Sequence, residues 1–133
     1  MSRKVNEEYK VLALINAQTM TGTVTGAAVA VEGYMDDAIV VPTVANFYGA
    51  PTVTITITGS LTGTPNTYDQ TLATFTAATA GGIAAASINL NNIANVKGVA
   101  TFAGGASPTV CIGIVLLARL FAKATATNSV TLA

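Results

Sequence analysis

Histidine and tryptophan are absent from the sequence, and charged side chains make up only 9% of its 133 residues. Histidine is the side chain that most often acts as a general base or binds a metal near neutral pH. The basic and acidic residues cancel to a net charge of zero, so no basic surface for nucleic acid is expected. These absences argue against an enzyme, a bound cofactor or metal, and a nucleic-acid partner.

Cysteine occurs once, as Cys111, so no disulfide can form within the chain. Its apolar neighbours predict a small, buried residue on a strand, unreactive in the native state. The longest apolar run, Val110 to Ala118, is far shorter than the ~20 residues that cross a bilayer. The N-terminus also lacks the apolar stretch of a secretory signal. We therefore expect a soluble protein made in a cytoplasm, with no membrane partner.

Hydrophobic residues make up 51% of the chain, and threonine and glycine fill much of the rest. A chain of this length suits one domain with a single layered core. So few charges on so apolar a chain predict that partner proteins cover part of its surface.

The segment Thr52 to Ser60, TVTITITGS, is the clearest local signal in the chain. Val53, Ile55 and Ile57 alternate with threonines, which is the period of a half-buried strand. Every residue before the closing glycine and serine is β-branched, which suits a pleated sheet. We expect the apolar side to pack against the strand at 109–121 or its neighbours, and the threonine side to meet water.

Turn residues cut the chain into short pieces at roughly 8–12-residue spacing, which is typical of β-sandwiches and barrels. The pattern predicts an all-β fold: an antiparallel, jelly-roll-like β-sandwich of about eight strands with a short N-terminal arm. The expected divisions are an arm at 1–10, the sandwich at 11–123 and a C-terminal tail at 124–133. The predicted strands are Val11–Ile15, Ala27–Glu32, Ala38–Val41, Thr52–Thr58, Tyr68–Thr76, Ala86–Leu90, Lys97–Phe102 and Thr109–Phe121.

Thr109 to Phe121 is apolar on both of its faces. One side carries Val110, Ile112, Ile114, Leu116 and Leu120, and the other carries Cys111, Val115, Leu117 and Phe121, interrupted by Arg119. A strand of this kind is covered on both sides. In a two-layer sandwich one face belongs to the core, so the other requires the N-terminal segment, a long loop or another protein chain.

The chain has six basic and six acidic residues, and five of these twelve fall within the first ten positions. Val5, Tyr9, Leu12 and Asn16 have helical spacing, so a short helix and an extended arm that orders on a partner are both open. Complementary charges at a contact set register and partner choice, and Tyr9 adds an aromatic anchor. The candidate interaction residues are Arg3, Lys4, Glu7, Glu8, Tyr9, Lys10 and Arg119.

Acidic and aromatic residues supply weaker candidates for a site. Asp36 and Asp37, with Glu32, form either a solvated acidic turn or a weak cation site. The aromatic side chains are scattered among predicted strand ends, which favours packing in the core and at the rim over a platform for a sugar or a base. These are Tyr34, Tyr48, Tyr68, Phe47, Phe75 and Phe102.

A series of motifs between about Gly22 and Lys123 has a recognisable order. It runs through Gly26–Tyr34, Asp37–Val41, TVTITITGS, Thr74–Thr76, Ser87–Leu90, Val96–Phe102 and the final apolar strand. This order resembles small virion proteins of tailed bacteriophages, of the head decoration or cement type. Such proteins are β-sandwich subunits that bind the outside of a capsid shell and brace it. Tail and fibre proteins have similar patterns, and the resemblance implies no catalytic residues.

The resemblance implies a structural protein on the capsid surface of a virion, synthesised in the host cytoplasm. Its expected partners are the major capsid protein and copies of itself, in a homo-oligomer. A phage tail or fibre protein is one alternative, and a carbohydrate-binding β-sandwich module is another. Aromatic side chains gathered in one groove would favour the carbohydrate-binding module, whereas an apolar patch would favour the cement protein.

Overall fold

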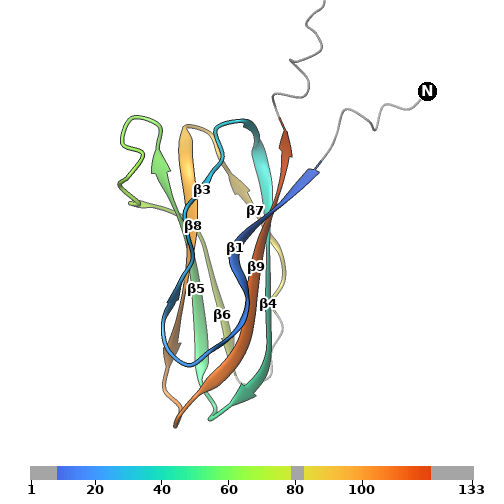
Figure 1. Ribbon diagram of the computed structural model, residues 1–133, viewed down its shortest axis with the longest axis vertical. Coiled ribbons are helices and arrows are strands. Elements are labelled where there is room, and N and C mark those ends of the chain that lie inside the picture. The colour runs from blue at the N-terminus through green and yellow to red at the C-terminus, as the bar shows by residue number, and fades with distance from the viewer. Residues whose placement is uncertain (1–8, 79–82, 121–133) are drawn as a thin grey trace, which may run out of the picture.

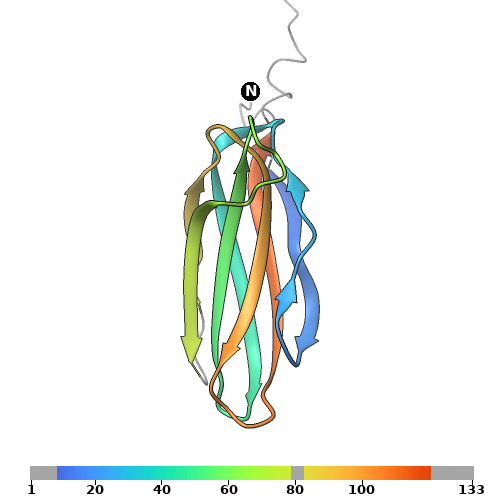
Figure 2. The same cartoon turned by 90° about the vertical axis from the view of Figure 1, so that its left-hand side faces the viewer.

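The computed structural model describes residues 9–78 and 83–120, which form a β-sandwich of two antiparallel sheets (Figures 1 and 2). Arg3, Lys4, Glu7 and Glu8 of the predicted arm, and the predicted tail at 124–133, lie outside the described residues. The strands are β1 (Tyr9–Met20), β2 (Val24–Thr25), β3 (Val29–Ala30), β4 (Tyr34–Tyr48), β5 (Thr52–Leu61), β6 (Gln70–Ala78), β7 (Ala86–Asn89), β8 (Ile93–Ala103) and β9 (Thr109–Leu120).

The strand order corresponds to one long antiparallel hairpin that is rolled up. β1 pairs with β9, β2 and β3 pair with β8, β4 pairs with β7, and β5 pairs with β6. Pairing of β9 with β4 and of β8 with β5 then completes a first sheet, β1-β9-β4-β7, and a second sheet, β2-β8-β5-β6. Nested pairs shared between two sheets define a jelly roll. The predicted jelly-roll-like, all-β sandwich is therefore confirmed.

Each predicted strand overlaps an observed one, and the differences lie in the lengths. β1 begins at Tyr9, before the expected start at Val11, and runs on to Met20 because it pairs along the length of β9. The helical alternative at the N-terminus is therefore wrong from Tyr9 onward. The predicted strand at 27–32 is shortened to β3, and a second short strand, β2, precedes it outside the predicted range. The segment that joins β2 and β3 lies against β1.

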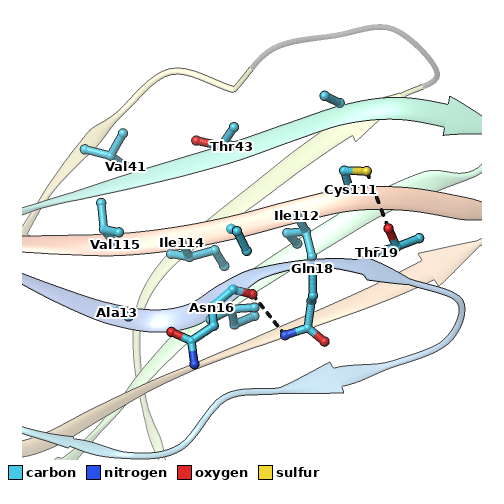
Figure 3. A pocket seen from close by; sticks show the side chains of 14 residues that line it. Ala13, Asn16, Gln18, Thr19, Val41, Thr43, Cys111, Ile112, Ile114 and Val115 are labelled. Carbon is cyan, nitrogen blue, oxygen red and sulfur yellow. Dashed lines mark hydrogen bonds between the residues drawn. The ribbon is translucent and has the colours of Figure 1, made fainter.

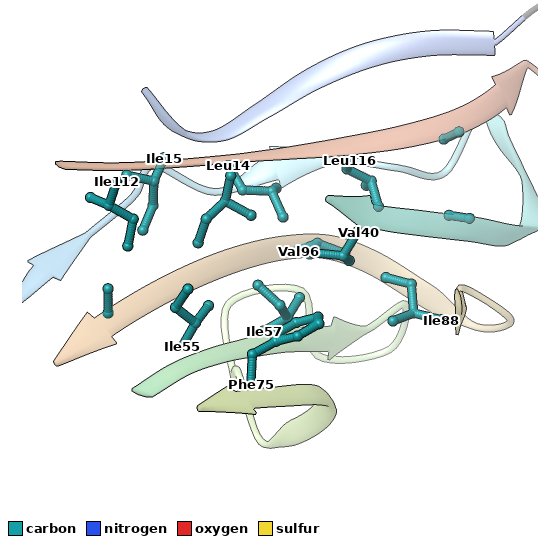
Figure 4. Packing of buried hydrophobic residues seen from close by; sticks show 14 of the residues in the cluster. Leu14, Ile15, Val40, Ile55, Ile57, Phe75, Ile88, Val96, Ile112 and Leu116 are labelled. Carbon is teal, nitrogen blue, oxygen red and sulfur yellow. The ribbon is translucent and has the colours of Figure 1, made fainter. Parts of the chain in front are cut away.

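The core lies between the two sheets and joins β5 to β9 (Figure 4). Ile55 and Ile57 of β5 are fully buried, as are Ile114 and Leu116 of β9. Gly98 of β8 marks the meeting point, since an added Cβ would lie 3.3 Å from Ile57 Cδ1 and 3.7 Å from Ile114 Cδ1. The expected packing of the apolar side of β5 toward β9 is thus confirmed.

The segment that joins β2 and β3 closes the sandwich beside the edge strand β1. Gly26 in this segment donates a backbone hydrogen bond of 2.9 Å to the Gly98 carbonyl of β8. A side chain at Gly26 would overlap the backbone carbonyl of Leu14 in β1. This close approach covers part of an edge that would otherwise offer free backbone groups to another strand.

Replacing Ile55 by alanine should lower the free energy of unfolding by roughly 2–5 kcal/mol, because the substitution leaves a cavity in a closely packed core. Thr56→Ala, one residue along the same strand, serves as the matched control. Thr56 is half-buried on the outer face, and changes at such positions usually stay within about 0.5 kcal/mol. Chemical denaturation of the two variants measures both values, and equal losses would contradict the assignment of faces.

Candidate interaction surface

The two outer faces of the sandwich differ in chemistry. On the second sheet, Thr54 of β5 lies opposite Thr76 of β6 and Thr101 of β8. Thr56 lies opposite Thr74 in the next outward row. These side chains are half-buried or exposed. Their hydroxyl groups can bond to water, so this face needs no protein to cover it.

The outer face of the first sheet is apolar across its central strands. Val11 of β1, Leu117 of β9 and Ile39 of β4 form one cross-strand row, because Leu117 pairs with both of the others. The next row joins Ala13, Val115 and Val41 in the same way. We call these two rows the apolar face. Val11 is 66% exposed and the β9 and β4 members are half-buried, so nothing in the described part of the chain lies over the face.

A groove of about 640 Å³ adjoins the apolar face (Figure 3). It arises where β1 leaves regular register between Ala13 and Gln18, while β4 continues on the other side of β9. Gly113 lies on its floor, where an added Cβ would be 3.4 Å from the Cα of Ala17. The remaining lining includes Thr19, Val41, Thr43, Ala45, Cys111 and Val115, with the amides Asn16 and Gln18 on the β1 side. Most of the exposed lining is apolar, which favours an apolar occupant.

Arg119 lies at the end of the apolar face away from this groove. Its Nη2 donates to both carboxylate oxygens of Asp37, each at 3.0 Å. The guanidinium carbon also lies 5.9 Å from the centre of the Tyr9 ring. The structure therefore brings together two of the predicted interaction residues, Tyr9 and Arg119, and adds Asp37. Lys10, the next residue of β1, is exposed.

The hydrogen bond from Arg119 lowers the pKa of Asp37, and desolvation opposes this shift without reversing it. A lowered carboxyl pKa contributes stability above the pKa of the unfolded chain, and this stability is lost as pH falls through the folded value. The Asp37 side chain is 65% exposed, so solvent screens the pair and its contribution is small. Its clearer effect is to hold Arg119 in place and to neutralise both charges at this edge of the face.

The expectation that Cys111 is buried and unreactive is wrong in its first half. Cys111 occupies an outward position of β9 and is half-buried on the groove floor. Asn46 Nδ2 donates to its sulfur at 3.5 Å, and the Thr19 hydroxyl lies 3.7 Å away. The hydrogen bond from Asn46 has the larger effect and that with Thr19 the smaller, and both lower the pKa of the thiol. Successive side chains on a strand point to opposite faces. Val110 and Ile112 are therefore buried in the core, whereas Cys111 between them lies on the outer face, and its apolar neighbours did not indicate burial of Cys111 itself.

The acidic residues at the start of β4 do not gather into a metal site. Asp36 and Asp37 lie within the strand and not on a turn, and they line a small open pocket with Glu32. Asp37 is already bonded to Arg119. Within residues 9–78 and 83–120, no group of three acidic or cysteine side chains is placed to hold a metal ion.

Within the described ranges, the aromatic side chains do not form a platform. Phe75 is buried, and Tyr34, Phe47 and Phe102 pack against the core. Tyr68 lies under Lys97, whose Nζ is 4.4 Å from the ring centre. Tyr48 is 66% exposed, but the groove lining contains no aromatic residue.

The sequence pattern indicated the β9 part of the apolar face but not the parts from β1 and β4. Ile39 and Val41 carried a usable signal, because the run Ala38–Val41 is apolar at both odd and even positions, as β9 is. Val11 carried none, since a single valine at the start of a strand fits either face.

The described part of the chain contains no helix that is long and apolar enough to cross a membrane.

Alkylation of Cys111 in the native monomer should proceed without denaturant, with a pH midpoint below that of the unfolded protein. The reason is that hydrogen bonds to the sulfur favour the thiolate. Asn46→Asp removes the donor, adds a negative charge and tolerates the positive φ of 55° at this position. It should therefore move the midpoint to higher pH. Asn66→Asp, which adds the same charge in the loop between β5 and β6, should leave it unchanged.

Comparison with known proteins yields a likeness of fold only. No family model and no curated protein matches the chain. Among solved structures, the crystal structure of SPBc2 prophage-derived protein YomS is similar, with a TM-score of 0.47 and 10% sequence identity. The match covers 82% of this chain and 93% of that chain. Similarity at this level carries no information about what this chain binds.

Proposed function

We propose that this chain is a non-catalytic structural subunit of a bacteriophage virion, of the decoration or cement type, which binds and braces the capsid shell. The observation that carries the proposal is the contrast between the two outer faces of the jelly roll. One face is lined by threonine and suits water, whereas the other is apolar, open and hollowed. Jelly rolls serve both as viral capsid proteins and as lectins, so the fold alone does not choose between them.

Contact through the apolar face is driven by removal of aliphatic surface from water. A contiguous exposed patch of this kind marks a protein interaction site in a stable protein. A subunit that binds only the assembled shell stabilises that shell by mass action, with no chemical step. This mechanism needs neither a catalytic group nor a cofactor.

The arm before β1 supplies a second contact in this proposal. β1 begins at Tyr9, beside Arg119 and Asp37. In the sequence, Arg3, Lys4, Glu7 and Glu8 precede Tyr9. We assign the contact with the major capsid protein to this arm, because complementary charges select a partner and its register.

The alternatives make different demands on the surface. A carbohydrate-binding module needs aromatic rings together with polar groups that fix the sugar, and the groove lining contains no aromatic residue. A tail or fibre subunit would use the same apolar face, so only its place in the virion distinguishes it from a cement protein.

Disruption of the gene in the phage that carries it tests the proposal. Heads should assemble but lose their DNA at a lower temperature than wild-type heads, and added purified protein should restore the difference. Tailless or non-adsorbing particles would identify a tail or fibre subunit. Particles that match wild type in assembly, adsorption and heat stability would refute a structural role in the virion.

Deletion of residues 2–8 should leave the melting temperature of the free subunit unchanged, because exposed ion pairs contribute only about 0–1 kcal/mol and β1 is left whole. Occupancy on particles, measured by gel densitometry, should fall. A matched variant that keeps the length but replaces Arg3, Lys4, Glu7 and Glu8 with serine separates charge from chain length. Full occupancy after the deletion would rule out a role for the arm in binding.

A further inference from the structure

We propose that two copies of this chain associate through their apolar faces, with β9 of one copy antiparallel to β9 of the other. In this arrangement Leu117 of each copy enters the groove over Gly113 of its partner. The proposal deepens the proposed function, because it assigns the apolar face to a second copy and leaves the shell to the arm.

The spacing along β9 makes the face complementary to itself. Gly113 lies two residues before Val115 and Leu117 lies two residues after it. All three occupy outward positions on the same face of β9. A twofold axis that crosses the strands at Val115 therefore places Leu117, the largest apolar side chain on the outward side of β9, over the glycine of the other copy. The distance from Val115 to either residue is about 6.6 Å along the strand. An isologous interface requires this kind of match between a surface and itself.

The charges of the face also permit self-association. Neither the two rows of the apolar face nor the groove lining contains a charged residue, and Arg119 and Asp37 at the end of the face neutralise each other at 3.0 Å. A neutral face meets its own copy without repulsion between like charges. The neutrality of the face favours a second copy over a partner selected by charge.

The size of the sheet fits a dimer. With strands about 4.8 Å apart and a rise of about 3.3 Å per residue, the three long strands and the four-residue β7 give an outer surface of about 680 Å². This area falls within the roughly 600–1,000 Å² per partner that stable interfaces bury. Sheets that stack face to face in this way form β-sandwich interfaces about 10 Å thick.

Sedimentation velocity over a concentration series tests the proposal with the purified full-length chain. Leu117→Asp places a charge in the contact and should raise the dimer Kd at least ~30-fold, as loss of a central anchor does. Thr56→Asp adds the same charge on the threonine face and should leave the Kd unchanged. Thermal melts confirm that both variants are folded.

Ala45→Trp distinguishes specific docking from general stickiness. Ala45 is exposed and lines the groove, so tryptophan fills the space that Leu117 of the other copy would enter. Specific docking predicts a weaker dimer, whereas non-specific association predicts a stronger one because apolar surface is added. Alkylation of Cys111 on the groove floor should also slow as concentration rises in the wild type, but not in Leu117→Asp.

The outcomes separate this proposal from the proposed function. A wild-type chain that stays monomeric at all concentrations, or one whose dimer persists in Leu117→Asp and tightens in Ala45→Trp, overturns the proposal. If such a chain still occupies and stabilises phage heads, the proposed function stands. If it dimerises as expected but gene disruption leaves the particles unchanged, the dimer stands and the proposed function fails.

Discussion

The position of β9 between β1 and β4 is the constraint on which the rest of the structure depends. Backbone pairing on both edges makes it the central strand of its sheet. Its inward residues, Ile112, Ile114 and Leu116, are buried against the opposite sheet. Because side chains on a strand alternate, the same backbone presents Cys111, Val115 and Leu117 on the other side. One strand therefore builds both the core and the surface for a partner.

The two faces of β9 differ in what covers them. β5 and β8 cover the inner face, with Gly98 where Ile57 and Ile114 converge. On the outer side, the irregular register of β1 opens a groove beside the aliphatic rows. The threonine-lined face of the second sheet has neither feature. This difference in chemistry between two layers of one domain is the physical basis for assigning the first sheet to protein contact.

Much of the fold could be predicted because its signals are local. The alternation in TVTITITGS identified β5 and the side of it that faces the core. Turn residues then separated the strands. The length of β1 could not be predicted, since pairing with β9 extends it to Met20 and no residue between 16 and 20 indicates a strand by itself. The division of residues 24–30 into two short strands follows from the approach of Gly26 to Leu14, which is a contact between distant parts of the chain.

The sequence by itself determined the class of the fold, the core side of β5 and the need to cover both faces of β9, because each depends on residues that are neighbours along a strand. Only the tertiary structure decided what stands beside β9. It placed Val11 and Ile39 next to Leu117, Asp37 against Arg119, and Asn46 against the Cys111 sulfur. These contacts join residues far apart in the chain. Their register depends on the pairing of whole strands, which no local pattern specifies.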